Sequence, residues 1–198
     1  MIKAAATDWR QRTGWLLASL AAALSLLATD VHAIKNGDFV IVAAYADEID
    51  GVYYLNATID YDLNDVALEA LARGVALTFE LRIDVRRTLK WRPDKNVAEL
   101  LQLYELRYHA LSERYIVRNL NSGEQESFLT LAAALLRLGE VRELPVLDSA
   151  LLRDEREYVL RLKTVLDIRS FPGPLRVLDV FFGDWRLASE WYDWRLPH

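Results

Sequence analysis

Cysteine is absent from this 198-residue chain, and its single methionine stands at position 1. The rest of the chain therefore has no thiol nucleophile, no disulfide and no thioether that could bind a metal. Thiol redox chemistry and covalent catalysis by cysteine are excluded. A domain of this size can bury a sufficient apolar core without disulfides, so their absence does not argue against an exported protein.

Histidine is scarce as well, since the chain has three in total: His32, His109 and His198. No two of them have the spacing of a zinc site, and no serine lies in a Gly-x-Ser-x-Gly motif. His109 alternates with Glu105 and Arg107 on the polar face of an expected strand, where a solvated side chain is the ordinary interpretation and a general base the alternative. We expect no catalytic residue, no metal site and no cofactor.

An excess of basic charge is also missing. Residues 34–198 carry 21 basic and 27 acidic side chains, a net charge of −6, so we expect no nucleic-acid partner. One local basic run contains Arg86, Arg87, Lys90 and Arg92. These side chains either meet a phosphate or an acidic partner, or they solvate an outer face of the domain.

The N-terminal 33 residues have the pattern of a secretory signal peptide. Lys3, Arg10 and Arg12 precede an uncharged apolar stretch over residues 15–28, and the compact residues that follow predict cleavage after Ala33. The stretch is 14 residues long, whereas a bilayer-spanning helix needs about 20, which disfavours a retained membrane anchor; a cytosolic helix is the third alternative. We expect a periplasmic protein with no stable membrane span after cleavage.

Residues 34–198 predict a single domain, because no linker rich in proline, glycine or serine divides them. Residues 39–46 and 52–61 predict a β-hairpin. Its turn, residues 47–51, is acidic, and either it is a polar turn or its carboxylates bind Ca²⁺, for which the ligand set is incomplete. Residues 75–86 alternate between apolar and charged side chains and predict a half-buried strand.

Two short helices are expected, each followed by a glycine. Asn64 caps the first, which runs to about Arg73 and is followed by Gly74. Ser127 caps the second, over residues 128–138, which is followed by Gly139.

Further strands are expected from about residue 101 to 110 and over residues 114–120, 144–148 and 158–168, and a short apolar helix over residues 174–182. The fold class is therefore α+β: a mainly antiparallel β-sandwich with two or three short helices, and the signal helix lies outside the domain. The order of hairpin, helix and strand occurs twice, which indicates either an internal repeat or a chance recurrence of a common plan.

Aromatic residues gather near the C-terminus: Trp185, Trp191, Tyr192 and Trp194. If residues 185–196 form a closing strand, Trp185 and Trp191 complete the core together with Leu187 and Ser189. Tyr192 and Trp194 fall on the opposite alternation, where we expect them at the surface. The alternative is an aromatic platform that stacks on a sugar or a peptide.

Four segments have a familiar combination and order: 70–75 (ALARGV), 108–115 (YHALSERY), 172–176 (PGPLR) and 185–192 (WRLASEWY). They resemble a family of exported proteobacterial proteins catalogued as domain of unknown function 4390, also labelled "proline-rich signal peptide protein". The resemblance covers most of residues 39–196. It implies a signal peptide followed by one envelope domain, assigns no catalytic residue, and suggests a link to a membrane sensor kinase.

Two functions from different classes remain open. The first is a noncatalytic protein-interaction or signalling accessory module, which binds an envelope protein through a sheet edge or the aromatic tail. The alternative is an envelope glycan- or lipid-binding protein, or a hydrolase that uses paired carboxylates.

Overall fold

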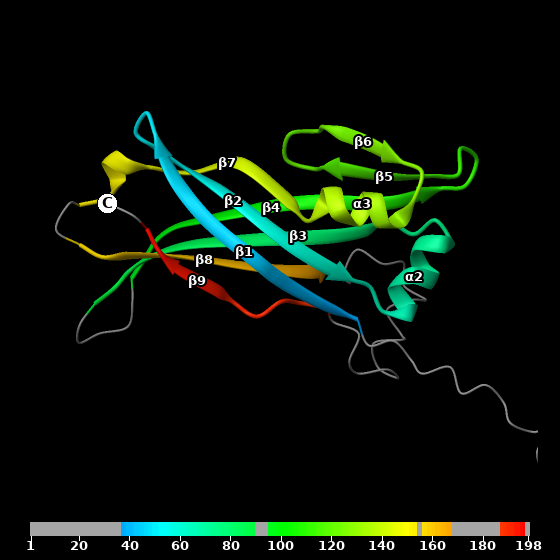
Figure 1. The fold of residues 1–198 in the computed structure, drawn as a ribbon, viewed down its shortest axis with the longest axis horizontal. Helices are drawn as coiled ribbons and strands as arrows, with labels where there is room; N and C mark the ends of the chain where they lie inside the picture. Colours follow the sequence, from blue (N-terminus) through cyan, green and yellow to red (C-terminus); the bar gives the residue numbers. More distant parts are fainter. Residues whose placement is uncertain (1–36, 90–94, 154–155, 168–186, 197–198) are drawn as a thin grey trace, which may run out of the picture. The chain divides into compact units, whose positions relative to one another are not determined.

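A computed structural model describes residues 37–89, 95–153, 156–167 and 187–196, all within the unit Lys35–His198 (Figure 1). The predicted signal peptide with its cleavage site at Ala33, Arg92, Trp185 and the helix expected over residues 174–182 lie outside the described residues. In the part that is described, no helix is long and apolar enough to cross a membrane.

Within these residues the strands form two antiparallel sheets, and the smaller sheet begins with the expected hairpin. Strand β1 (Asp38–Ile49) pairs with β2 (Val52–Asp62), which pairs with β7 (Glu140–Asp148), in the order β1-β2-β7. The hairpin turn consists of two residues, Asp50 and Gly51, with φ of 50° and 81°. Positive φ at both central positions is typical of the two-residue turn that matches the twist of paired strands. Because this turn is shorter than the predicted turn over residues 47–51, β1 extends further toward it than the sequence predicts.

The larger sheet has the order β6-β5-β4-β3-β8-β9 among the described residues. Its strands are β3 (Leu77–Arg87), β4 (Lys95–His109), β5 (Arg114–Asn119), β6 (Gln125–Phe128), β8 (Tyr158–Asp167) and β9 (Tyr192–Arg195). The predicted alternation of β3 and β8 is confirmed, because their alternate apolar side chains are buried. Strand β4 begins at Lys95, well before the start that its alternation indicates.

Two α-helices and one short 3-10 turn, η1 (Ser149–Leu151), complete the described fold. Helix α2 (Asp65–Ala72) begins as predicted, since the side chain of Asn64 accepts a hydrogen bond from the N–H of Ala67 at 2.9 Å. The other helix, α3 (Leu131–Leu138), is capped by Thr130, whose hydroxyl accepts from the N–H of Ala133 at 3.2 Å.

The prediction that Ser127 caps the second helix is therefore wrong. Residues Gln125–Phe128 form β6, and Ser127 lies opposite Ile116 of β5. The apolar spacing from Phe128 onward resembles a helical face, but Phe128 packs against the core from a strand. Tertiary pairing with β5 overrides the local pattern.

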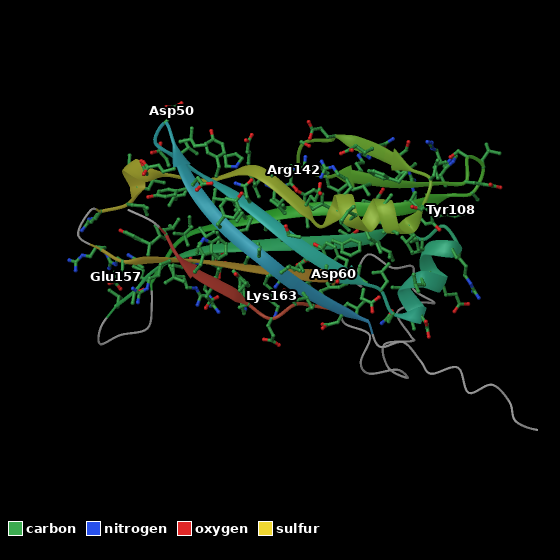
Figure 2. The ribbon with its side chains drawn as sticks, viewed as in Figure 1. Asp50, Asp60, Tyr108, Arg142, Glu157 and Lys163 are labelled. Atoms are coloured by element: carbon green, nitrogen blue, oxygen red, sulfur yellow. The ribbon has the colours of Figure 1, made fainter. Side chains whose placement is uncertain are left out.

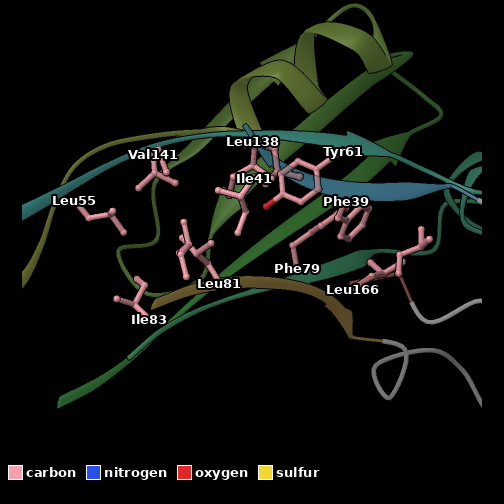
Figure 3. Packing of buried hydrophobic residues seen from close by; sticks show 14 of the residues in the cluster. Phe39, Ile41, Leu55, Tyr61, Phe79, Leu81, Ile83, Leu138, Val141 and Leu166 are labelled. Atoms are coloured by element: carbon pink, nitrogen blue, oxygen red, sulfur yellow. The ribbon is translucent and has the colours of Figure 1, made fainter. Parts of the chain in front are cut away.

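The core lies between the two sheets (Figure 3). At one end Phe39 of β1, Tyr61 of β2 and Phe79 of β3 form a triangle of rings whose centroids are 4.8 to 5.7 Å apart. Such edge and offset contacts stabilise a core beyond the area that the rings bury. The predicted α+β sandwich is thus confirmed, and helix α3 contacts both sheets, through β2 and β7 on one side and β5 and β6 on the other.

The two halves of the chain share an order of elements, but equivalent elements lie in opposite sheets. In the first half the hairpin lies in the three-stranded sheet, and the strand after the helix, β3, lies in the six-stranded sheet. In the second half β4, β5 and β6 belong to the six-stranded sheet, and β7 returns to the three-stranded one. The second half also contains an additional strand, β6, before its helix.

Candidate functional site

Strand β1 is an edge strand of the three-stranded sheet. It is 12 residues long and pairs with β2, and no described strand pairs with its other edge. The other sheet edges are less accessible to a new strand. Strands β6 and β9 have four residues each, and β7 contains Pro145 and pairs with β2 in an irregular register. Short edges, proline, charged side chains and irregular pairing are means by which proteins prevent unwanted strand addition. Strand β1 lacks the first two, and its charged residues, Asp38, Asp47 and Glu48, lie near its ends.

The side chains of β1 divide into an anchored set and an exposed set. Phe39, Ile41 and Ala46 are buried in the core. The exposed set contains the large apolar side chains Val40 (47% exposed), Val42 (60%), Tyr45 (55%) and Ile49 (50%), together with Ala43 and the carboxylates of Asp38, Asp47 and Glu48. A shift of register at Val42 separates two regularly paired stretches, Asp38–Ile41 and Ala43–Ile49. Strand β1 is therefore fixed to the core by its buried side chains, and its exposed side chains are apolar in the middle and acidic near both ends.

The hairpin that carries this edge is strongly acidic. Residues 38–62 contain six carboxylates and no lysine, arginine or histidine; the carboxylates belong to Asp38, Asp47, Glu48, Asp50, Asp60 and Asp62. At the hairpin tip, burial and the neighbouring carboxylate of Glu48 raise the pKa of the Tyr53 hydroxyl. We call β1 together with these acidic residues the acidic edge.

Sequence reasoning singled out the C-terminal aromatic residues, and the structure places them differently. Leu187 and Ser189 are buried as expected. However, Ala188 lies opposite Val165, and Tyr192 lies opposite Leu162. The C-terminal segment therefore advances four residues, from Ala188 to Tyr192, while β8 advances three. One extra residue reverses the alternation between them.

Because of this reversal, Tyr192 and Trp194 pack against the core, with ring centroids 5.9 Å apart, and Trp191 lies outside it. The guanidinium of Arg161 lies 4.6 Å from the centroid of the Trp191 ring, and the ammonium of Lys163 lies 5.8 Å from it. The expectation that Trp191 completes the core and that Tyr192 and Trp194 are at the surface is wrong. The described aromatic residues do not form one platform.

The two described arginines of the predicted basic run do not share a surface either. Arg86 and Arg87 are consecutive residues of β3, so their side chains point to opposite faces of the sheet. Arg86 donates to the carboxylate of Asp84 at 2.9 Å, and Arg82 on the same face pairs with Glu80. These pairs favour the interpretation that the basic residues solvate and neutralise an outer face.

Sequence reasoning gave no sign of a cavity of about 220 Å³ that lies beside α3, β4, β5 and β7. Its charged lining consists of Glu124, Glu126, Glu140, Glu143, Arg137 and Arg142. Arg137 pairs with Glu126 at 2.7 Å, and Arg142 pairs with Glu140 at 2.7 Å. The first pair ties α3 to β6, so these groups act as a junction between elements.

Tyr104 also lines the cavity. Burial raises the pKa of its hydroxyl, Arg137 opposes the rise, and Glu124 adds to it. The residues meet here from strands and a helix that are distant in the sequence, so no local motif could have indicated the cavity.

Other candidates occupy surface turns. His109, the last residue of β4, has its Nδ1 2.8 Å from the hydroxyl of Ser112 in the exposed turn that follows. In the described part of the chain, no group of three or more histidine, aspartate or glutamate side chains could hold a metal ion.

These features define an α+β sandwich domain with one long acidic edge. Residues 36–195 match the family described as "Domain of unknown function (DUF4390)", and the chain belongs to this family. The resemblance found from the sequence is thereby confirmed. Comparison with curated proteins and with solved structures gave no match.

Proposed function

We propose that this chain is an exported, noncatalytic protein-interaction domain that binds a partner protein of the cell envelope by adding an extended segment of the partner to β1. The observation that carries the proposal is the 12-residue edge strand β1, whose second edge pairs with no strand among the described residues and which bears exposed apolar side chains. The pattern of residues 1–33 supports the envelope as the compartment. The family resemblance makes a membrane sensor kinase the first partner to test.

Strand addition uses the backbone groups that an edge strand leaves unpaired. Main-chain hydrogen bonds supply affinity, and contacts with alternate side chains supply specificity. On β1, Val40 and Tyr45 are exposed beside this edge and available for such contacts. Because Phe39 and Ile41 fix the strand to the core, the domain itself loses little conformational entropy on binding.

The alternative functions receive less support from the geometry. A glycan platform would require exposed aromatic rings, but Tyr192 and Trp194 pack against the core. Hydrolysis by paired carboxylates would require two free carboxyl groups in a cleft. Of the four glutamates that line the cavity, Glu126 and Glu140 are held by arginines, and Glu124 accepts a hydrogen bond from the Ser122 hydroxyl at 3.3 Å, which leaves Glu143. Strand addition at β1 is therefore the function that the described residues support best.

The test places a photo-crosslinking amino acid at Val42 and, as a matched control, at Leu136, which is 67% exposed on α3. Both versions of the full-length chain are illuminated in living cells, and the adducts are identified by mass spectrometry. We expect one envelope protein to be linked at position 42 and not at position 136. Adding Tyr45→Ser should reduce the yield of this adduct several-fold, because it removes an apolar contact beside the edge.

The proposal fails if position 42 yields no more adduct than position 136, or if Tyr45→Ser leaves the yield unchanged. The free energy of unfolding of the Tyr45→Ser chain is measured in parallel. Because Tyr45 is exposed, we expect it to change by at most about 0.5 kcal/mol.

A further inference from the structure

We infer that the segment accepted by β1 is cationic: an extended stretch in which lysine or arginine residues alternate with apolar residues. This inference rests on the proposed function and names the chemistry of the partner at the same edge. It follows from the distribution of charge around β1, from the contrast with the rest of the domain, and from the mismatch that a second copy would create.

The carboxylates flank both ends of the apolar part of the edge. At one end Asp38 lies opposite Asp62, and Val40 lies opposite Asp60 on the neighbouring strand. At the other end Asp47 and Glu48 precede the turn. Figure 2 shows Asp50 at the hairpin tip and Asp60 toward the opposite end of the hairpin. A strand added along β1 would therefore have carboxylates near both of its ends.

Elsewhere in the described structure, several carboxylates on the strands pair with arginines of the same or a neighbouring strand. Glu80 pairs with Arg82, Asp84 pairs with Arg86, and Asp193 of β9 pairs with Arg161 of β8 at 2.8 Å. The β1–β2 hairpin contains no basic residue that could provide the same compensation. The charges of Asp47, Glu48, Asp50 and Asp60 are therefore not offset by a basic residue of either strand of the hairpin, and they favour a cationic partner.

Charge also decides between two kinds of occupant. If a second copy of this chain paired antiparallel along β1, carboxylates at one end of each strand would approach those at the other end, Asp38 against Asp47 and Glu48. Like charges opposite one another destabilise strand pairing. A basic segment meets the opposite situation, in which complementary charge accelerates association and discourages incorrect partners.

The experiment pans a phage-displayed library of random peptides, about twelve residues long to match β1, against the full-length chain. The same library is panned against a double variant that combines Val42→Ser with Tyr45→Ser and leaves the charge of the chain unchanged. Peptides enriched on the parent chain and lost on this variant depend on the edge. We expect these peptides to contain more lysine and arginine than aspartate and glutamate, with apolar residues between the charges.

Binding of one such peptide is then measured on the double variant that combines Asp47→Asn with Asp60→Asn. The matched control is Glu113→Gln, which changes an exposed carboxylate in the β4–β5 turn. We expect the first variant to weaken binding roughly tenfold and the control to leave it unchanged. Raising the salt concentration should also weaken binding to the parent chain.

Edge-dependent peptides that are neutral or acidic would overturn the cationic specificity and leave strand addition at β1 intact. Equal binding by the double variant (Asp47→Asn with Asp60→Asn) and by the parent chain would likewise overturn the cationic specificity and leave strand addition intact. If no enriched peptide depends on Val42 and Tyr45, the proposed function itself fails, and the inference fails with it.

Discussion

The hydroxyl groups of Tyr61 and Thr164 lie 3.0 Å apart in the core and join the two sheets. Tyr61 belongs to β2 of the three-stranded sheet, and Thr164 belongs to β8 of the six-stranded sheet. Both residues are buried, and the Tyr61 ring also contacts Phe39 and Phe79. A polar contact between apolar layers fixes how the sheets align, because each hydroxyl is costly to leave without a partner.

This contact predicts coupling between the two residues. Tyr61→Phe leaves the Thr164 hydroxyl buried without its partner and should lower the free energy of unfolding by about 1–3 kcal/mol. Thr164→Val should have a similar effect on the partner hydroxyl. The double variant should lose less than the sum of the two, as measured by urea unfolding of all four chains. Additive losses would show that the two hydroxyls do not stabilise one another.

The same tyrosine predicts a loss of stability in alkali. Burial raises the pKa of the Tyr61 hydroxyl above its value of 10.0 in the unfolded chain. Above about pH 10 the unfolded tyrosine loses its proton while the folded one keeps it, so the folded state binds more protons and stability falls as pH rises. Below that pH the contribution of Tyr61 is constant.

The fall due to this one group should approach about 1.4 kcal/mol per pH unit. It is measured as the difference between the parent chain and Tyr61→Phe, by urea unfolding from about pH 8 to about pH 11. Other titrating groups are common to both chains and cancel. A difference that stays constant over this range would contradict the prediction.

The sequence predicts those elements whose signals are local. The period of two in β3 and β8, the turn residues at Asp50 and Gly51, and the cap at Asn64 all act within a few residues of the chain. Each specifies its element before any distant contact forms. The fold class follows from these elements, because successive hairpins favour antiparallel sheets.

The sequence does not predict features that arise from distant pairings. The apolar residues of β1 indicate a strand, but whether a strand lies at the centre or the edge of a sheet depends on where β7 returns. The extra residue between Ala188 and Tyr192 becomes evident only when the tail lies beside β8. Both the acidic edge and the cavity beside α3 depend on tertiary contacts of this kind.

Helix α3 offers a direct comparison of local and tertiary signals. Thr130 caps the helix, whereas Ser127 lies in β6. Replacing Thr130 with alanine removes the acceptor for the Ala133 N–H and should cost about 1 kcal/mol of unfolding free energy. Ser127→Ala serves as the control and should cost at most about 0.5 kcal/mol, because this exposed side chain caps no helix. Reversed magnitudes would restore the cap that the sequence pattern suggests.

The end of α3 imposes a second requirement, at Gly139. Its backbone approaches β2 so closely that an added Cβ would lie 2.0 Å from the carbonyl oxygen of Ile59, and the Ile59 N–H donates to the Gly139 carbonyl at 2.8 Å. Since φ at Gly139 is −77°, alanine fits the backbone conformation there, and its cost is steric. Gly139→Ala should therefore separate α3 from β2 and reduce the free energy of unfolding by about 3 kcal/mol or more.

Gly123→Ala provides the matched control. Gly123 has φ of 82°, and no atom lies within 4 Å of an added Cβ, so alanine there should cost about 1 kcal/mol through backbone strain alone. Urea unfolding of both variants, together with hydrogen exchange at the Ile59 amide, separates the two causes. Faster exchange at Ile59 in Gly139→Ala and not in Gly123→Ala is the expected result. Equal losses and unchanged exchange would mean that β2 can move away from α3 at little cost, and that the approach at Gly139 does not fix the helix to the sheet.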